Sequence, residues 1–372
     1  MEAIDFQYKS KLFTRLTEEI SEIRKRGVFT TKAFLESNIV KIINEETNLQ
    51  YTLRVYHSSF PDAAVCNFVL DKNNPLIDNE GRPFLSNINL ENVKALLGAK
   101  TNGWIDYTRG KVGGVFAKIQ NSLHVTTGIV ADGIYTDEEV AAIFCHEIGH
   151  TFTAYSQIAN VIGMNYIIQD ISDRLKGVAD RTVAIDIIHE YDTRYGIKLP
   201  AEEITAVMEN ETKMVTKLVV EVSKWRRNAE GDYVFSARNS EMMADQFAAR
   251  MGAGRAVVTG LDKMERHYGL SDQYQSRITH VMSQTFSVLI RLVISLAIPP
   301  ALIFFILGVW LDNPQKKAYD DPIERYTRVR NETIVGLKNS KITSEMKKVL
   351  LEDIAEIDRV IKLLNNQKPL LS

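Results

Sequence analysis

The chain has 372 residues, of which 45% are hydrophobic and 25% charged, and its formal net charge is −2. This length allows two or three domains with a substantial core. The lack of a basic excess argues against nucleic acid as a partner. Two cysteines, Cys66 and Cys145, are too few for a disulfide framework. These features favour a globular protein of a reducing compartment.

The N-terminal part of the chain combines helix and strand patterns. Apolar residues at helical spacing predict a helix over residues 5–26, closed by Gly27, and a second helix over 31–44. Alternating or short apolar runs then predict strands at 51–56, 63–70, 115–119 and 122–126. We therefore expect an N-terminal helical segment, residues 1–48, followed by a domain, residues 49–285, that contains a small antiparallel sheet.

The run His146-Glu147-Ile148-Gly149-His150 carries the strongest chemical signal in the sequence. Residues four apart lie on one face of a helix, so both imidazoles can face a single ion. Glu147 then lies close enough to take a proton from a metal-bound water. The run predicts a catalytic site with one Zn²⁺ per chain. The alternative is a helix that carries two unrelated surface histidines.

A helix through this run has a recognisable beginning. Thr136 is followed three residues later by Glu139, the pattern of a capping box. Apolar residues at helical spacing continue from there through both histidines. Most of the chain from 163 to 227 is also expected to be helical.

A catalytic zinc site needs a third protein ligand. The other five histidines lack a partner at the spacing of metal ligands: His57, His124, His189, His267 and His280. A helix would place Glu241 and Asp245 on one face, and the small Ala244 would permit close approach to another helix. We expect Glu241 to bind the ion and Asp245 to accept a hydrogen bond from a ligand imidazole. The alternative is a pair of solvated surface carboxylates.

Several stretches together resemble one family, the gluzincin-type zinc endopeptidases that include HtpX and the CAAX prenyl endopeptidases. The similar stretches are residues 66–68, 125–130, 136–142, 237–245 and 254–264. The fourth of them resembles the Arg-x-x-Glu-x-x-Ala-Asp motif of that family. The resemblance extends over about residues 60–160 and 233–270.

The resemblance implies a zincin-like fold, mainly α with a small antiparallel β-sheet (α+β). It also implies that His146, His150 and Glu241 bind zinc, that Glu147 is the general base, and that Asp245 supports a ligand. Substrate would bind by strand addition, along the strand that contains Leu123, His124 and Val125.

The chain departs from the family pattern near its C-terminus. The family usually has His-Pro followed by Arg, whereas this chain has Asp321-Pro322 and then Arg325. If this segment docks at the site, we expect Arg325 to support an oxyanion or a structural carboxylate. His267 is a further candidate for the role of the missing histidine.

Residues 292–311 contain no charged side chain. A run of about 20 apolar residues is long enough to cross a bilayer, although Pro299-Pro300 would break or kink a helix. Either this segment, 286–312, contacts a membrane, or it is buried in a soluble cytoplasmic protein. A single crossing would place Arg325 on the opposite side from the active site. Beyond it, residues 313–372 are expected to form a helical hairpin, with helices at 322–337 and 343–365.

The sequence thus predicts a zinc-dependent endopeptidase that acts on proteins or peptides and is membrane-associated, with its catalytic domain in the cytoplasm. The alternative is a catalytically silent protein of the same fold with a scaffold role in a larger assembly. Glu147 favours the enzyme, because a scaffold has no chemical need for a general base. A structural metal site would need a fourth ligand such as cysteine, and none is suitably spaced. Substrate identity and oligomeric state stay open.

Overall fold

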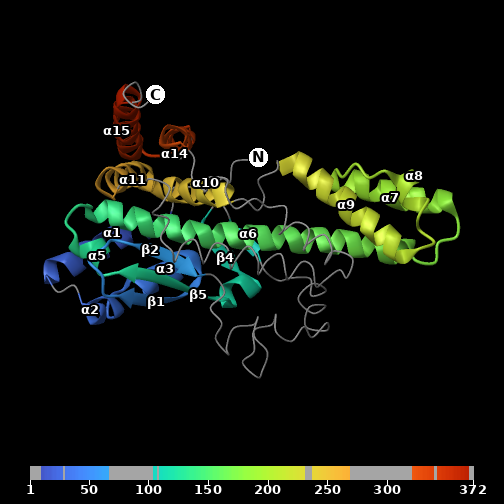
Figure 1. Ribbon diagram of the computed structural model, residues 1–372, viewed down its shortest axis with the longest axis horizontal. Helices are drawn as coiled ribbons and strands as arrows, with labels where there is room; N and C mark the ends of the chain where they lie inside the picture. Colours follow the sequence, from blue (N-terminus) through green and yellow to red (C-terminus); the bar gives the residue numbers. More distant parts are fainter. Residues whose placement is uncertain are drawn as a thin grey trace.

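The computed structural model describes residues 10–27, 30–66, 104–106, 109–230, 237–268, 321–338 and 342–367. The protein is mainly helical and has a small sheet, as expected. One helix, α6 (Asp137–Leu175), runs through the length of the molecule (Figure 1). The sheet and the N-terminal helices lie on one side of α6, and the helices that follow residue 237 lie on the other (Figure 1).

Helix α6 is 39 residues long, about 60 Å at the helical rise. The predicted capping box is confirmed: Thr136 Oγ1 accepts a hydrogen bond from Glu139 N, and the Glu139 carboxylate accepts one from Thr136 N. Lys263 donates a further hydrogen bond to the same carboxylate. The beginning of α6 is therefore fixed both by its own cap and by a neighbouring helix.

The main sheet is mixed, in contrast to the antiparallel sheet expected from the sequence. Its three strands, β1 (Gln50–Tyr56), β5 (Gln120–Thr126) and β2 (Ala63–Cys66), lie in the order β1-β5-β2. β5 is inserted between the other two and pairs parallel with β1 and antiparallel with β2. A separate antiparallel pair joins β3 (Trp104–Asp106) to β4 (Lys111–Gly113).

The prediction of a strand at 115–119 is wrong, because residues 115–118 belong to a 3₁₀ helix, η1 (Gly114–Lys118). Gly114 has a φ of 62°, a left-handed conformation that ends the preceding strand and is open to glycine. Phe116 in this turn is buried and stacks on Tyr155 of α6. A short apolar run has the same pattern whether it is buried as a strand or as a turn.

The N-terminal helices pack into the same core as the sheet. α1 (Leu12–Arg26) buries Leu12, Leu16, Ile20 and Ile23, and Gly27 ends it in the left-handed conformation, as expected. The second predicted helix is divided into α2 (Thr31–Leu35) and α3 (Ile39–Thr47). The break occurs at Asn38, whose backbone and side-chain N–H groups both donate to the Glu19 carboxylate.

A second, smaller core lies at the other end of α6. It is formed by the last turns of α6 with α7 (Arg181–Tyr195), α8 (Ala201–Thr205) and α9 (Glu211–Glu230). These helices extend away from the sheet (Figure 1). The region expected to be helical between 163 and 227 is therefore confirmed, and it has a core of its own.

The chain then returns along α6. α10 (Ala237–Ala248) continues through a π-helical turn, η2 (Ala249–Ala253), into α11 (Gly254–Tyr268). The predicted C-terminal hairpin is confirmed as α14 (Pro322–Leu337) and α15 (Ser344–Gln367). Its apolar residues join the main core together with those of α1. The hydrophobic core thus runs across the segment boundaries expected at residues 48 and 313.

Within the described ranges, no helix is long and apolar enough to cross a membrane. The apolar run at 292–311 lies outside these ranges.

Candidate metal centre

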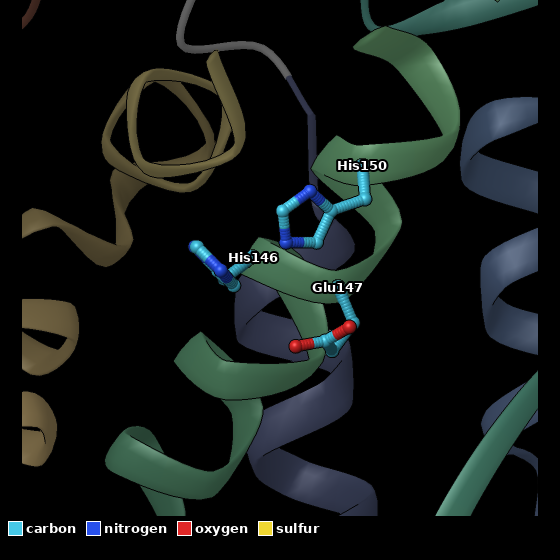
Figure 2. A group of neighbouring side chains, drawn as sticks. All are labelled: His146, Glu147 and His150. Carbon is cyan, nitrogen blue, oxygen red and sulfur yellow. The ribbon is translucent and has the colours of Figure 1, made fainter. Parts of the chain in front are cut away.

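Helix α6 places His146, Glu147 and His150 together in its first half, opposite α10. One donor atom from each of the three lies within 4.8 Å of the others. Figure 2 shows the two imidazoles and the carboxylate projecting from successive turns of the helix. The side chains of His146 and His150 are only 12% and 13% exposed. This burial excludes the alternative of two surface histidines.

α10 approaches α6 so closely that no side chain fits between them at one point. A Cβ on Gly149 would lie 2.8 Å from the Cα of Ala244, well inside contact distance. The expectation that the small Ala244 permits close approach is confirmed. Gly149, in the middle of the histidine run, has the same role and was not identified from the sequence.

This approach brings the carboxylate of Glu241 to both imidazoles. Glu241 Oε2 lies 3.3 Å from His146 Nε2, and Glu241 Oε1 lies 3.5 Å from His150 Nε2. Zinc binds nitrogen and oxygen at about 2.0–2.2 Å in a tetrahedron, so two of its ligand atoms are separated by about 3.4 Å. The chemical types of these donors fit Zn²⁺, and so does each of the two distances, although a different oxygen of Glu241 lies near each imidazole. The group of described residues whose donor atoms gather within 4.8 Å is His146, Glu147 and His150.

The other nitrogen of each imidazole lies close to a side chain of α10. Asp245 Oδ1 lies 2.9 Å from His146 Nδ1, and Ser240 Oγ lies 3.0 Å from His150 Nδ1. Contacts of this kind fix the orientation and tautomer of an imidazole that binds a metal through Nε2. Asp245 was expected in this position, whereas Ser240 was not. Each ring thus presents Nε2 to Glu241.

Arg325 of α14 reaches the same group of residues, across 80 positions of sequence. Its guanidinium contacts both oxygens of Asp245, from Nε at 2.5 Å and from Nη2 at 2.7 Å. Nη2 also lies 3.4 Å from Glu241 Oε2. Two roles were expected for Arg325, support of an oxyanion or of a structural carboxylate. Its contacts correspond to the second role. Arg325 and the two histidines necessarily lie on the same side of any membrane that the protein contacts.

The other two residues considered near the C-terminal part of the site, Asp321 and His267, are both exposed. Asp321 is the exposed N-cap of α14, and its carboxylate accepts a hydrogen bond from Ile323 N. His267 is exposed on α11, where its ring contacts Lys263 O of its own helix. Neither side chain takes the place of the histidine that the family pattern has before proline.

The strand expected to bind substrate, with Leu123, His124 and Val125, is not free to do so. Each of these residues is paired on both sides, with β1 and with β2, because β5 is the central strand. The ring of His124 lies between Ser122 Oγ and the hydroxyl of Tyr56, at 2.7 and 2.9 Å. The prediction was wrong because the pattern of a buried strand does not distinguish a central strand from an edge strand.

The strand next to the site is β2. Among the described strands it pairs only with β5, and it packs against α6. Alternate residues of an antiparallel strand turn their N–H groups away from the partner strand. The backbone N–H of Val65 lies near the carboxylate of Glu147 and opposes the rise that burial causes in the pKa of this group. Glu147 is therefore held between the histidine helix and the edge of the sheet.

The burial of the site and its charges shift several pKa values. Burial raises the pKa of Glu147 to about 8 and lowers that of His150 to about 4. Burial alone would lower the pKa of His146, but the carboxylates of Asp245 and Glu241 outweigh it and raise this pKa to about 10. Binding of a cation through His146 Nε2 would then release a proton.

No protein-family model matches the chain, and no match was found among curated proteins or among solved structures. The function of the chain therefore has to be inferred from the site itself.

Proposed function

We propose that the protein is a zinc-dependent endopeptidase with a zincin-like fold, related in design to the gluzincin-type enzymes. The observation that supports this most directly is the position of Glu241. Its two carboxylate oxygens face His146 Nε2 and His150 Nε2 at 3.3 and 3.5 Å, while Ser240 of α10 bonds His150 Nδ1 and Asp245 lies 2.9 Å from His146 Nδ1. His146, His150 and Glu241 would hold the ion, and a fourth position would be open to water.

A zinc ion bound by these residues would supply a Lewis acid for the scissile carbonyl group and would lower the pKa of a bound water. Glu147 takes the proton of that water on its carboxylate and passes it to the nitrogen of the leaving amine. The N–H of Val65, which lies near this carboxylate, would stabilise its charged form. Burial favours a protonated Glu147, and a base with a pKa near the working pH can both accept and return a proton.

The remaining polar residues hold the ligands in place. Asp245 and Ser240 fix the two imidazoles, and Arg325 fixes the carboxylates of Asp245 and Glu241. Arg325 also compensates a concentration of negative charge that is buried beside the histidines. Without Arg325, the carboxylates of Asp245 and Glu241 would lie close together in a medium of low dielectric constant, which would raise the free energy of the folded protein.

The substrate would be an extended segment of a protein or peptide. The edge of β2 that pairs with no other described strand would pair with it, since main-chain hydrogen bonds can hold a peptide beside a sheet whatever its side chains are. This assigns to Ala63–Cys66 of β2 the role that the sequence had suggested for β5. Preference for particular side chains would be weak.

The proposal is tested by the zinc content of the purified protein, measured by mass spectrometry for wild type, Glu241→Gln and a control, Glu203→Gln. Glu203 is on α8, where its carboxylate pairs with Lys217. We expect one zinc per chain in wild type and in the control, and loss or weakening of zinc in Glu241→Gln. A wild-type protein that takes up no zinc from a buffered solution would refute the proposal.

A catalytically silent scaffold is the alternative, and activity distinguishes it. Wild-type protein with one zinc per chain should cleave unfolded casein, and chelation of the zinc should stop the cleavage. A scaffold would bind zinc without cleaving.

A further inference from the structure

Helix α14 is attached to the helix that carries Glu241 at two separate points. The first is Arg325, which contacts Asp245 and Glu241. The second is Glu332, seven residues later and thus two turns along the same face of α14. Glu332 is not in contact with the metal centre, and nothing in the sequence had pointed to it.

The carboxylate of Glu332 joins α14 to both α10 and the π-helical turn that follows it. Its Oε1 accepts a hydrogen bond from Gln246 Nε2 at 3.0 Å. Its Oε2 accepts one from Arg250 Nε at 2.7 Å and lies 2.6 Å from Arg250 Nη2. The Arg250 side chain is only 2% exposed. A buried guanidinium of this kind depends on its partner, because an isolated buried charge is strongly unfavourable.

The packing around this second point is tight. A Cβ on Gly254, the first residue of α11, would lie 2.8 Å from Thr333 Oγ1 of α14. The two helices are therefore in direct contact there. The turn itself is distorted at Gly252, whose φ is 90°. Tyr326 and Val329, between the two attachment points, are 1% exposed. α14 therefore packs closely against α10 and the π-helical turn along the stretch that joins the two attachment points.

We propose that Glu332 is a positioning residue for the metal centre. It acts through α14: by fixing this helix to Gln246 and Arg250, it keeps the guanidinium of Arg325 on Asp245 and Glu241. The inference rests on the proposed zinc site and adds to it that metal affinity depends on the docking of α14. Coupling of this kind is reciprocal, so zinc binding must in turn strengthen the docking of α14.

The first test uses wild-type protein. Hydrogen exchange of the backbone amides of α14 is measured without metal and with zinc. We expect zinc to slow exchange in α14 as well as in α6 and α10, while exchange in α7, in the second core, stays unchanged. If zinc slows exchange in α6 and α10 but leaves the exchange rates in α14 unchanged, the inference is overturned and the zinc site stands. Absence of zinc binding would instead overturn the proposed function.

The second test measures the affinity for zinc by competition with a chelator, and the absorption spectrum of the protein loaded with Co²⁺. Glu332→Gln should weaken zinc binding about tenfold, at the lower limit for residues that support metal ligands. Gln246→Leu removes one hydrogen bond to Glu332 and leaves the ion pair with Arg250, so it should fold and show a smaller loss. The Co²⁺ spectrum should change in Glu332→Gln if Glu241 is no longer held by Arg325.

Asp358→Asn is the matched control. Asp358 of α15 pairs with Arg330, on the more exposed side of the same helix α14. Its loss should lower stability slightly without changing zinc affinity or the Co²⁺ spectrum. If folded Glu332→Gln and Gln246→Leu bind zinc as tightly as wild type, Glu332 has a structural role only and the inference is wrong.

Discussion

Gly149 of α6 and Ala244 of α10 lie in direct backbone contact: a Cβ on Gly149 would be 2.8 Å from Ala244 Cα and 2.9 Å from its carbonyl oxygen. Glu241 precedes Ala244 by one turn, and Asp245 follows it directly. The separation of the two helices at this contact therefore sets the distance between Glu241 and the two imidazoles.

Replacement of Gly149 tests this relationship. Gly149→Val would separate α6 and α10, move Glu241 away from His146 and His150, and weaken zinc binding at least tenfold, because ligands must be held at close to their bonding distances. The measurement is zinc affinity by competition with a chelator. Gly260→Val serves as a comparison variant. A Cβ at Gly260 would lie 3.5 Å from its nearest neighbour, Glu139 Cβ, which is an ordinary contact distance, so zinc affinity should change less than in Gly149→Val. Equal zinc affinity in Gly149→Val and wild type would contradict the account.

Arg325→Lys should destabilise the protein. Lysine supplies a point charge and cannot repeat the two parallel contacts of the guanidinium with Asp245. Since both partners are buried, we expect a loss of about 2–3 kcal/mol in the free energy of unfolding. Urea denaturation of the metal-free protein measures it.

Arg330→Lys on the same helix is the control for Arg325→Lys. Its ion pair with Asp358 is largely exposed to solvent, so we expect a loss below about 1 kcal/mol. Similar losses in the two variants would show that the contact of Arg325 with Asp245 contributes no more than a surface pair.

Asp353 of α15 should make stability depend on pH. Burial raises its pKa to about 6, although Arg255 opposes the shift, and Glu138 and Glu352 add to it. The pKa in the unfolded chain is about 3.9. Since the folded state binds the proton more tightly, the contribution of this group to stability is present below about pH 4 and is lost as the pH rises through 6.

Asp353→Asn removes this titration. Relative to wild type, the variant should gain up to about 2 kcal/mol of stability as the pH is raised from 4.5 to 7.5. The melting temperatures of both proteins at pH 4.5 and pH 7.5 measure the gain. A difference that is the same at both pH values would show that the Asp353 carboxyl has its ordinary pKa in the folded protein.

The position of most helices could be predicted from the sequence because helix signals are local. The capping box at Thr136, the glycine at the end of α1 and the apolar periodicity of α14 and α15 are all read within a few residues. The divided helix at Asn38 could not be predicted in this way. Its cause is the pair of hydrogen bonds that Asn38 donates to the carboxylate of Glu19, which lies on another helix.

The same distinction applies to the site. His146, Glu147 and His150 lie on one helix, so their spacing alone predicted that they meet. Ser240 and Val65 have common residue types and reach the site only through the packing of α10 and of β2. The choice of β5 as the substrate strand failed for a related reason: which strand lies at an edge is decided by strand order, and no local pattern reports it.

The measurement that tests the central claim most directly compares zinc-loaded wild type with Glu147→Gln in the cleavage of unfolded casein. Glutamine keeps the size of the side chain and an oxygen that can accept the hydrogen bond from Val65 N–H, but it cannot take a proton. We predict the same zinc content in both proteins and a rate of cleavage at least about 100-fold lower in the variant. Equal rates in the two proteins, or no cleavage by wild type that holds one zinc per chain, would contradict the account.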